Sequence, residues 1–261
     1  IPDKKLSVQD VEAAMRDHYE GTPMALDSTD IGGGVWQMPY RPTPLYYEVN
    51  GKKYFNERPT STQQTGFSYV SQMRSWLPRQ IGGVLWFGND DCNMVAYTPI
   101  YCGNTFRPEC YDTPGADAVT FSMKNAYWVC NWVSNMVYPR YSLMFPSLKA
   151  VRDSLDQSYF AQQAEVEARA VELCKTSEEE AVKYLNTYSN TKAQQMLERW
   201  KELAFYLIVK YNDMAVKPDQ NGKFLRTKEG LGATVKRVGS AAAFQKKLAE
   251  TTGDKFLVPT E

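Results

Sequence analysis

The chain has 261 residues, 43% of them hydrophobic, which is enough for one large domain or one and a half. Thirty basic and thirty acidic residues cancel, so no overall field favours nucleic acid or an anionic membrane as a partner. No apolar run approaches the roughly 20 residues that span a bilayer. The sequence opens at Ile1 without an initiator Met or a basic-then-apolar leader, so we expect a removed signal or a start within a longer protein.

The composition changes near residue 146. Aromatic residues make up 13% of the chain and are concentrated before that point, whereas Glu, Lys, Gln and Ala dominate after it. The change predicts an α+β fold. Its expected parts are a sheet-rich part over residues 1–146, a helical layer over 147–215 packed on it, and a polar C-terminal extension of the same domain over 216–261.

The first predicted element is a helix over residues 6–19. Ser7 is placed to cap it, with Asp10 three residues later as in a capping box. Apolar residues at helical spacing are expected to form its buried face. These are Val8, Val11, Met15 and Tyr19.

Short strands follow. Residues 46–49 and 53–55 flank Asn50-Gly51, the strongest short signal for a β-hairpin. Runs rich in aromatic and branched residues, bounded by turn residues, predict further strands. These are residues 67–73, 83–87 and 94–97. Consecutive short strands with tight links indicate an antiparallel sheet.

From Ala126 the pattern turns helical, with interruptions expected near Pro139 and Pro146. One helix is predicted from Ser147 to about residue 175, and another after Ser177, where three glutamates suit the helix dipole. The second helix carries an apolar stripe. Its members are Ala193, Met196, Leu197, Trp200, Leu203, Ala204, Leu207, Ile208 and Tyr211. After residue 212 we expect little regular structure until residues 241–248.

Three stretches, taken in order, resemble a known family. They are Met-Arg-Asp-His-Tyr-Glu-Gly-Thr-Pro at residues 15–23, Arg58-Pro59 followed by residues 62–74, and residues 83–87 leading to Tyr-Thr-Pro-Ile-Tyr at 97–101. Together they resemble the PepD-like cysteine dipeptidases of the N-terminal-nucleophile hydrolases. That family is also similar to the secernins and, more remotely, to penicillin acylases and bile salt hydrolases. The resemblance covers roughly residues 8–110.

The resemblance implies an αββα sandwich and a cysteine nucleophile at the mature N-terminus, with its own α-amino group as the base. An α-amine titrates near about pH 8, so part of it is neutral at physiological pH. This chain departs from the pattern because residue 1 is Ile. The resemblance therefore implies that the chain is the C-terminal half of a dipeptidase and contains no catalytic nucleophile. Its expected partners are a dipeptide substrate and the N-terminal half of the same protein. The alternative is a non-catalytic binding or structural domain that keeps the fold.

Four residues are candidates for substrate binding. In related acylases an arginine of the second half lies near the nucleophile, so Arg58 or Arg74 is expected to hold a carboxylate, although Ser68 is an alternative match for that position. The competing interpretation is that both arginines pair with acids at the surface. His18 either lines the pocket or makes a structural hydrogen bond at a helix end. As the single histidine it excludes a His-based triad and a multi-histidine metal site.

The remaining motifs favour structural roles. The glycines at 32–34 lack a following Lys-Ser/Thr, and Asp90-Asp91 is typical of a turn, so no metal or other cofactor is expected. Cys102 and Cys110 flank a Gly- and Pro-containing loop and are disulfide candidates if the protein is exported, a location slightly favoured over the cytoplasm. The other cysteines are expected to be buried thiols. They are Cys92, Cys130 and Cys174.

Overall fold

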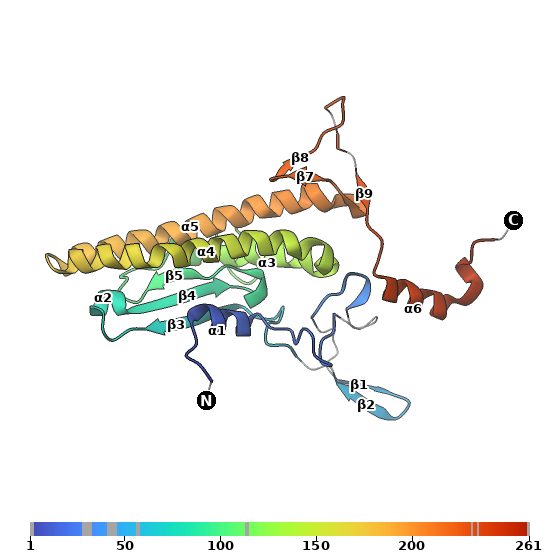
Figure 1. Ribbon diagram of the computed structural model, residues 1–261, viewed down its shortest axis with the longest axis horizontal. Helices are drawn as coiled ribbons and strands as arrows, with labels where there is room; N and C mark the ends of the chain where they lie inside the picture. The colour runs from blue at the N-terminus through green and yellow to red at the C-terminus, as the bar shows by residue number, and fades with distance from the viewer. Residues whose placement is uncertain are drawn as a thin grey trace. The chain divides into compact units, whose positions relative to one another are not determined.

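The structure is a computed structural model (Figure 1), and the residues it describes are 3–27, 33–40, 46–55, 58–112, 115–230, 232–233 and 235–259. The chain forms two compact units that interleave along the sequence. Unit 1 contains residues 1–17, 60–135 and 147–204, and unit 2 contains residues 18–59, 136–146 and 205–261. Within the described residues, helix makes up more of the chain than antiparallel sheet, which confirms the predicted α+β class.

Unit 1 is built on a three-stranded antiparallel sheet. Its strands, in spatial order, are β3 (Phe67–Met73), β4 (Gly83–Asn89) and β5 (Thr98–Tyr101). The predicted strands at 67–73 and 83–87 are confirmed. The strand predicted at 94–97 is wrong, because the side chain of Asp91 accepts a hydrogen bond from the Asn93 N–H and starts a 3-10 turn over Cys92–Met94. A short helix, α2 (Arg79–Gly82), joins β3 to β4.

Two long helices cover one face of this sheet, as Figure 1 shows. They are α4 (Tyr141–Cys174) and α5 (Glu178–Tyr211), joined side by side by a 3.3 Å hydrogen bond from the Tyr159 hydroxyl to the Lys192 carbonyl. Trp86 of β4 packs against Phe160 of α4 at 4.4 Å between ring centroids. Alternate β3 residues that face away from the helices are exposed, so the sheet has one covered and one open face. The exposed apolar ones are Phe67, Tyr69 and Met73.

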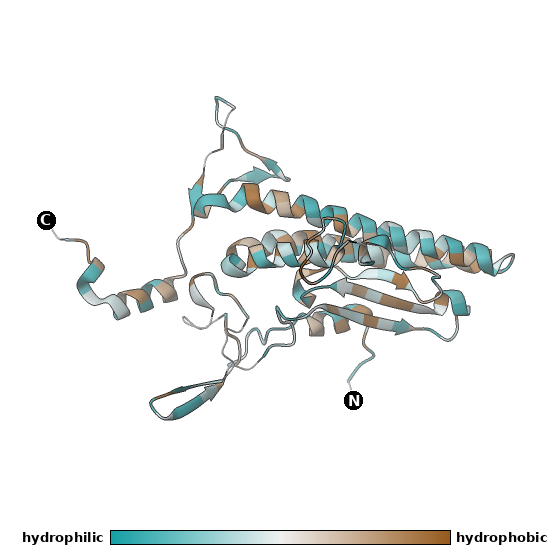
Figure 2. Cartoon of the chain, turned by 180° about the vertical axis from the view of Figure 1, so that it is seen from behind, coloured by the Kyte–Doolittle hydropathy of each residue, from teal (hydrophilic) through white to brown (hydrophobic). Residues whose placement is uncertain are grey.

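The apolar stripe predicted on α5 is buried, with one exception. Trp200 is fully buried and lies among residues of the same stripe, while Figure 2 shows hydrophilic residues along much of both long helices. Ile208 is 45% exposed, contrary to prediction. It lies one residue, or about 100° around the helix, from the buried Leu207, so it falls on the flank of the stripe.

The sequence predicted the start of α5 correctly but not the start of α4. The predicted start of α5 after Ser177 is confirmed, and the Ser177 hydroxyl accepts a hydrogen bond from the Glu180 N–H. The predicted start of α4 at Ser147 is wrong, because the helix begins at Tyr141 and continues through Pro146. A proline near the N-terminal end removes only one intrahelical hydrogen bond, which the rest of this long helix tolerates.

Two shorter helices complete unit 1. In α1 (Val8–Met15) the predicted capping box is confirmed, since Ser7 Oγ accepts from the Asp10 N–H at 3.1 Å and Asp10 accepts from the Ser7 N–H at 2.8 Å. The helix is shorter than predicted, since it ends at Met15. It lies beside β3, and side chains of both elements line one small cavity. The other helix, α3 (Ala126–Val137), is capped by Asn125, whose side chain accepts from the Trp128 N–H.

Unit 2 contains the predicted hairpin of β1 (Tyr46–Val49) and β2 (Lys52–Phe55). Asn50 and Gly51 both have positive φ, 52° and 74°, as a type I′ turn requires. In the tail, α6 (Ala242–Thr252) confirms the predicted helical segment. Four two-residue strands precede it that the sequence did not predict. They are β6 (Ala215–Val216), β7 (Asp219–Gln220), β8 (Lys223–Phe224) and β9 (Lys236–Arg237). No helix of the described residues has the length and apolar character needed to cross a bilayer.

Candidate functional site

Arg74 follows β3 and is engaged in a nearly buried ion pair. Its Nη1 donates to both carboxylate oxygens of Glu167 on α4, at 2.6 and 2.5 Å, and its Nη2 donates to the Ile81 carbonyl at 3.1 Å. The Tyr101 hydroxyl donates to the same carboxylate at 3.1 Å. The side chain of Arg74 is only 10% exposed. Arg74 therefore joins the sheet to α4 through Nη1 and Nη2, while its buried Nε has no hydrogen-bond partner among the described residues.

Ser68 is also turned inward. It lies on the covered face of β3, is buried, and its Oγ is 2.7 Å from the Tyr97 hydroxyl. The two hydroxyls satisfy each other, with either oxygen as donor. Burial raises the pKa of Tyr97, so this phenol stays protonated. Ser68 thus joins β3 to the segment that precedes β5.

His18 and Arg58 belong to unit 2. The imidazole of His18 is buried, its Nδ1 lies 3.0 Å from Glu20 Oε1, and its ring edge meets the Tyr40 ring at 4.8 Å. Its backbone N–H donates to Glu20 Oε2 at 2.8 Å. The Tyr19 hydroxyl donates to the Arg58 carbonyl at 2.8 Å, while Arg58 itself is exposed. His18 therefore makes a local structural contact, and Tyr19 ties the 15–23 stretch to Arg58.

A buried charged cluster in unit 1 is the feature that sequence reasoning missed. Arg16, at the end of α1, donates to the carbonyls of Cys92 and Val95, both at 3.1 Å, and to Asp156 Oδ2 at 2.8 Å. The other oxygen of Asp156, Oδ1, accepts from the Tyr97 N–H at 3.0 Å. Arg16 lies in the 15–23 stretch, so its position in a family motif is the sequence feature that could have identified it as a site residue. We call Glu12, Arg16, Arg152 and Asp156 the charged cluster.

Glu12 is the unexpected member of this cluster. It is 2% exposed, whereas Val8, Val11 and Met15, predicted to form the buried face of α1, are only partly buried. Burial, followed by repulsion from Asp156, raises the pKa of Glu12 to about 8. Its distance to Arg16, 3.8 Å, is long because that guanidinium already serves Asp156 and two carbonyls. The spacing of Glu12 and Arg16, four residues apart on a helix, is the pattern that could have revealed the pair.

The Asp90-Asp91 turn is a second buried polar group. Asp90 accepts hydrogen bonds from Asn131 at 2.9 Å and from Ser134, both on α3, and has a φ of +81°. Burial raises the pKa of Asp90 to about 7, although the hydrogen bonds from Ser134 and Asn131 act to lower it. Asp91 accepts from the Ser61 hydroxyl. The pair anchors the turn after β4 as predicted, and no cluster of three or more potential metal-ligating side chains occurs within the described ranges.

The cysteines are free thiols, so the structure does not contain the expected Cys102–Cys110 disulfide. Cys102 packs across Gly83, where a Cβ would come within 3.0 Å of its sulfur, while Cys110 is buried. Burial raises the pKa of Cys110 to about 12. Cys92 and Cys130 are buried as predicted, and Cys174 is only half-buried.

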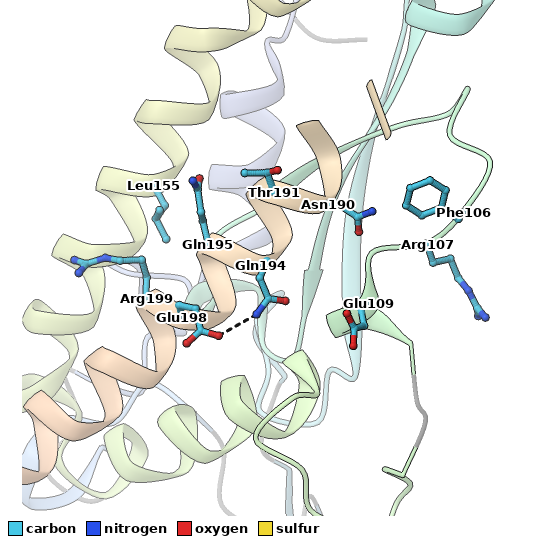
Figure 3. Close-up of a pocket in the computed structure, with 10 residues that line it drawn as sticks. All are labelled: Phe106, Arg107, Glu109, Leu155, Asn190, Thr191, Gln194, Gln195, Glu198 and Arg199. Carbon is cyan, nitrogen blue, oxygen red and sulfur yellow. Dashed lines mark hydrogen bonds between the residues drawn. The ribbon is translucent and has the colours of Figure 1, made fainter. Parts of the chain in front are cut away.

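A cavity of about 870 Å³ lies in unit 1 between α4, α5 and the loop before Tyr111 (Figure 3). None of the four candidate residues lines it. Several of its polar side chains bond within α5, as in the 2.9 Å hydrogen bond from Gln194 Nε2 to Glu198 Oε1 drawn in Figure 3, and Arg107 pairs with Asp112. The residues that line it are Phe106, Arg107, Glu109, Leu155, Asn190, Thr191, Gln194, Gln195, Glu198 and Arg199. This surface therefore has no link to the family motifs.

The chain is similar to a known protein family. The model of peptidase family C69 matches residues 1–154, more than half of the chain. The matched range includes all four candidate residues, the whole sheet of unit 1, and three of the four members of the charged cluster. No curated protein matches the chain.

Proposed function

Because the chain belongs to peptidase family C69, we propose that it is the C-terminal part of a dipeptidase whose nucleophile is an N-terminal cysteine outside residues 1–261. The observation that carries the proposal is the state of the chain's own thiols. A cysteine attacks as its thiolate, and burial in apolar surroundings opposes that form. Burial raises the pKa of Cys130 well above its usual value and raises the pKa of the more accessible Cys102 and Cys174 as well.

The proposed reaction is acyl transfer followed by hydrolysis. The α-amino group of the terminal cysteine takes the thiol proton as the sulfur attacks the peptide carbonyl, and it then gives a proton to the departing amine. Water hydrolyses the resulting thioester and regenerates the thiol. Every atom of this machinery except the substrate-positioning groups is assigned to the other part of the protein.

The role proposed for this chain is to complete the fold and to supply one wall of the substrate site. The open face of its sheet supports this role, because Phe67, Tyr69 and Met73 are 60%, 51% and 71% exposed on it. In an αββα sandwich a second antiparallel sheet packs on such a face about 10 Å away. We assign that second sheet to the N-terminal half of the same protein.

Residues 1–261 alone are expected to hydrolyse no dipeptide, because the proposed nucleophile lies outside them. The measurement is turnover of a dipeptide panel by the purified chain and by the complete protein. In the complete protein, Cys102→Ser and Cys174→Ser are expected to leave kcat unchanged. Turnover by the isolated chain that disappears in either variant would place the nucleophile here, and a complete protein without turnover would favour the non-catalytic domain.

Arg58 is the better of the two arginines for the substrate carboxylate, since Arg74 is already paired with Glu167. In the complete enzyme, Arg58→Lys is expected to raise KM roughly ten- to hundredfold with kcat kept, because lysine loses about 1.5–3 kcal/mol of charged hydrogen bonding. The matched variant Arg74→Lys is expected to lower the denaturation midpoint and keep KM. Steady-state kinetics and urea unfolding of both variants check this, and an exchange of the two phenotypes would reverse the assignment.

A further inference from the structure

Helix α1 is seated in unit 1 through a carboxyl group rather than an apolar side chain. Of its eight residues only Glu12 is buried. One carboxylate oxygen of Glu12, Oε1, has no hydrogen-bond partner among the residues that the structure describes. An unpartnered oxygen at such a position strongly disfavours a negative charge there.

The groups around Glu12 compensate for its charge only in part, because Arg16 and Arg152 favour the charged form less than burial and Asp156 oppose it. On its own helix, Arg16 lies 3.8 Å away and is held by Asp156 and two carbonyls. On α4, Arg152 is held by Asn93 at 2.7 and 2.6 Å, while Asp156 repels Glu12. Two other segments pack near α1, residues 92–97 and strand β3. Neither contains an acidic or basic residue, and their titratable side chains are Cys92, Tyr97 and Tyr69. Glu12 therefore lies near two arginines that are already bound to other groups and near one negatively charged carboxylate that repels it.

Of the two carboxyl groups of the charged cluster, Asp156 has the better compensation for a negative charge. Burial raises its pKa, but Arg16 and the Tyr97 N–H oppose that rise. Glu12 has the weaker compensation, and its pKa lies at about 8 against 4.5 for an ordinary glutamate. A seated α1 thus holds Glu12 as a neutral carboxylic acid at pH 7, whereas an unseated α1 exposes it to water as an anion.

We propose that Glu12 is a proton-controlled latch that seats α1 beside β3 when protonated and releases it as the pH rises. Between the pKa of an exposed glutamate, 4.5, and the pKa of the buried Glu12, about 8, opening of α1 releases one proton from the Glu12 carboxyl. The opening equilibrium therefore rises by up to tenfold per pH unit between about pH 5 and 8 and is level above pH 8. The latch stands on the charged cluster alone and does not require peptidase activity.

Native-state hydrogen exchange of the full chain tests the latch, with rates corrected for intrinsic exchange and with α5 core amides as the internal reference. The expected result is at least a tenfold larger opening constant for α1 amides at pH 7.5 than at pH 5.5. Glu12→Gln is expected to abolish the pH dependence, whereas the matched control Glu179→Gln, an exposed glutamate, keeps it. A pH-independent opening in the wild type, or an unchanged slope in Glu12→Gln, overturns the proposal.

A second measurement tests the latch without any variant, in case Glu12→Gln fails to fold. The ¹³C shift of the Glu12 side-chain carboxyl in the wild-type chain reports its titration directly. A midpoint near 8 supports the latch. A midpoint at the ordinary glutamate value, with α1 still protected, overturns it.

Discussion

Asp156→Ala is expected to destabilise the protein by roughly 3–5 kcal/mol, the usual cost of removing one partner of a buried ion pair. The carboxylate of Asp156 receives both the Arg16 guanidinium, at 2.8 Å, and the Tyr97 N–H, at 3.0 Å. The alanine variant leaves Arg16 with only two backbone carbonyls as hydrogen-bond acceptors and leaves the Tyr97 N–H without its acceptor. Urea unfolding followed by circular dichroism measures the loss, which is a large fraction of a typical stability of about 5–15 kcal/mol.

The matched control for that variant is Asp153→Ala on the same helix. Asp153 is 30% exposed and pairs with Arg152 and with Lys149, a side chain that is 52% exposed. Ion pairs that solvent reaches contribute about 0–1 kcal/mol. Equal losses in the two variants would show that the charge of α4, rather than the buried contact of Asp156, sets the stability.

Trp200→Ala is expected to cost roughly 3–5 kcal/mol, because the side chain is fully buried and its removal leaves a cavity. Trp200→Phe is expected to cost much less. The indole Nε1 of Trp200 has no hydrogen-bond partner among the described residues, so phenylalanine sacrifices no polar contact while keeping most of the apolar volume. Denaturation midpoints of the two variants measure the difference.

The control is Ile208→Ala, since Ile208 lies beside the stripe and is 45% exposed. Substitutions at such surface positions usually change stability by about 0.5 kcal/mol or less. A loss in Ile208→Ala as large as that in Trp200→Ala would mean that the flank of α5 is covered in solution.

The parts of the fold that the sequence predicted are those fixed by neighbouring residues. Asn50-Gly51 supplies the left-handed pair that a two-residue hairpin needs, and Ser7 with Asp10 supplies a complete capping box. The α5 stripe follows from one helical period. The failures are at positions where a neighbouring residue changes the local structure. Asp91 is one, because it starts a 3-10 turn that runs into the segment predicted as a strand from its aromatic and branched residues.

The contact within the charged cluster was beyond such reasoning, because Glu12 and Arg16 lie far in sequence from Arg152 and Asp156. Arg16 and Asp156 are separated by 140 positions, and no pattern in either helix indicates that they meet. The same limit explains the cysteines, since eight residues of spacing do not fix the directions of Cys102 and Cys110. The motif around Arg16 marked the segment, but not the contact that gives this arginine its role.

The position of α1 beside β3 also bears on aggregation. β3 is an edge strand, and its sequence, Phe-Ser-Tyr-Val-Ser-Gln-Met, contains none of the lysines or prolines that commonly prevent such a strand from pairing with another molecule. A helix laid along the edge is another form of protection, and α1 takes that place. Conditions that detach this eight-residue helix are therefore expected to expose β3 to pairing with a strand of another molecule.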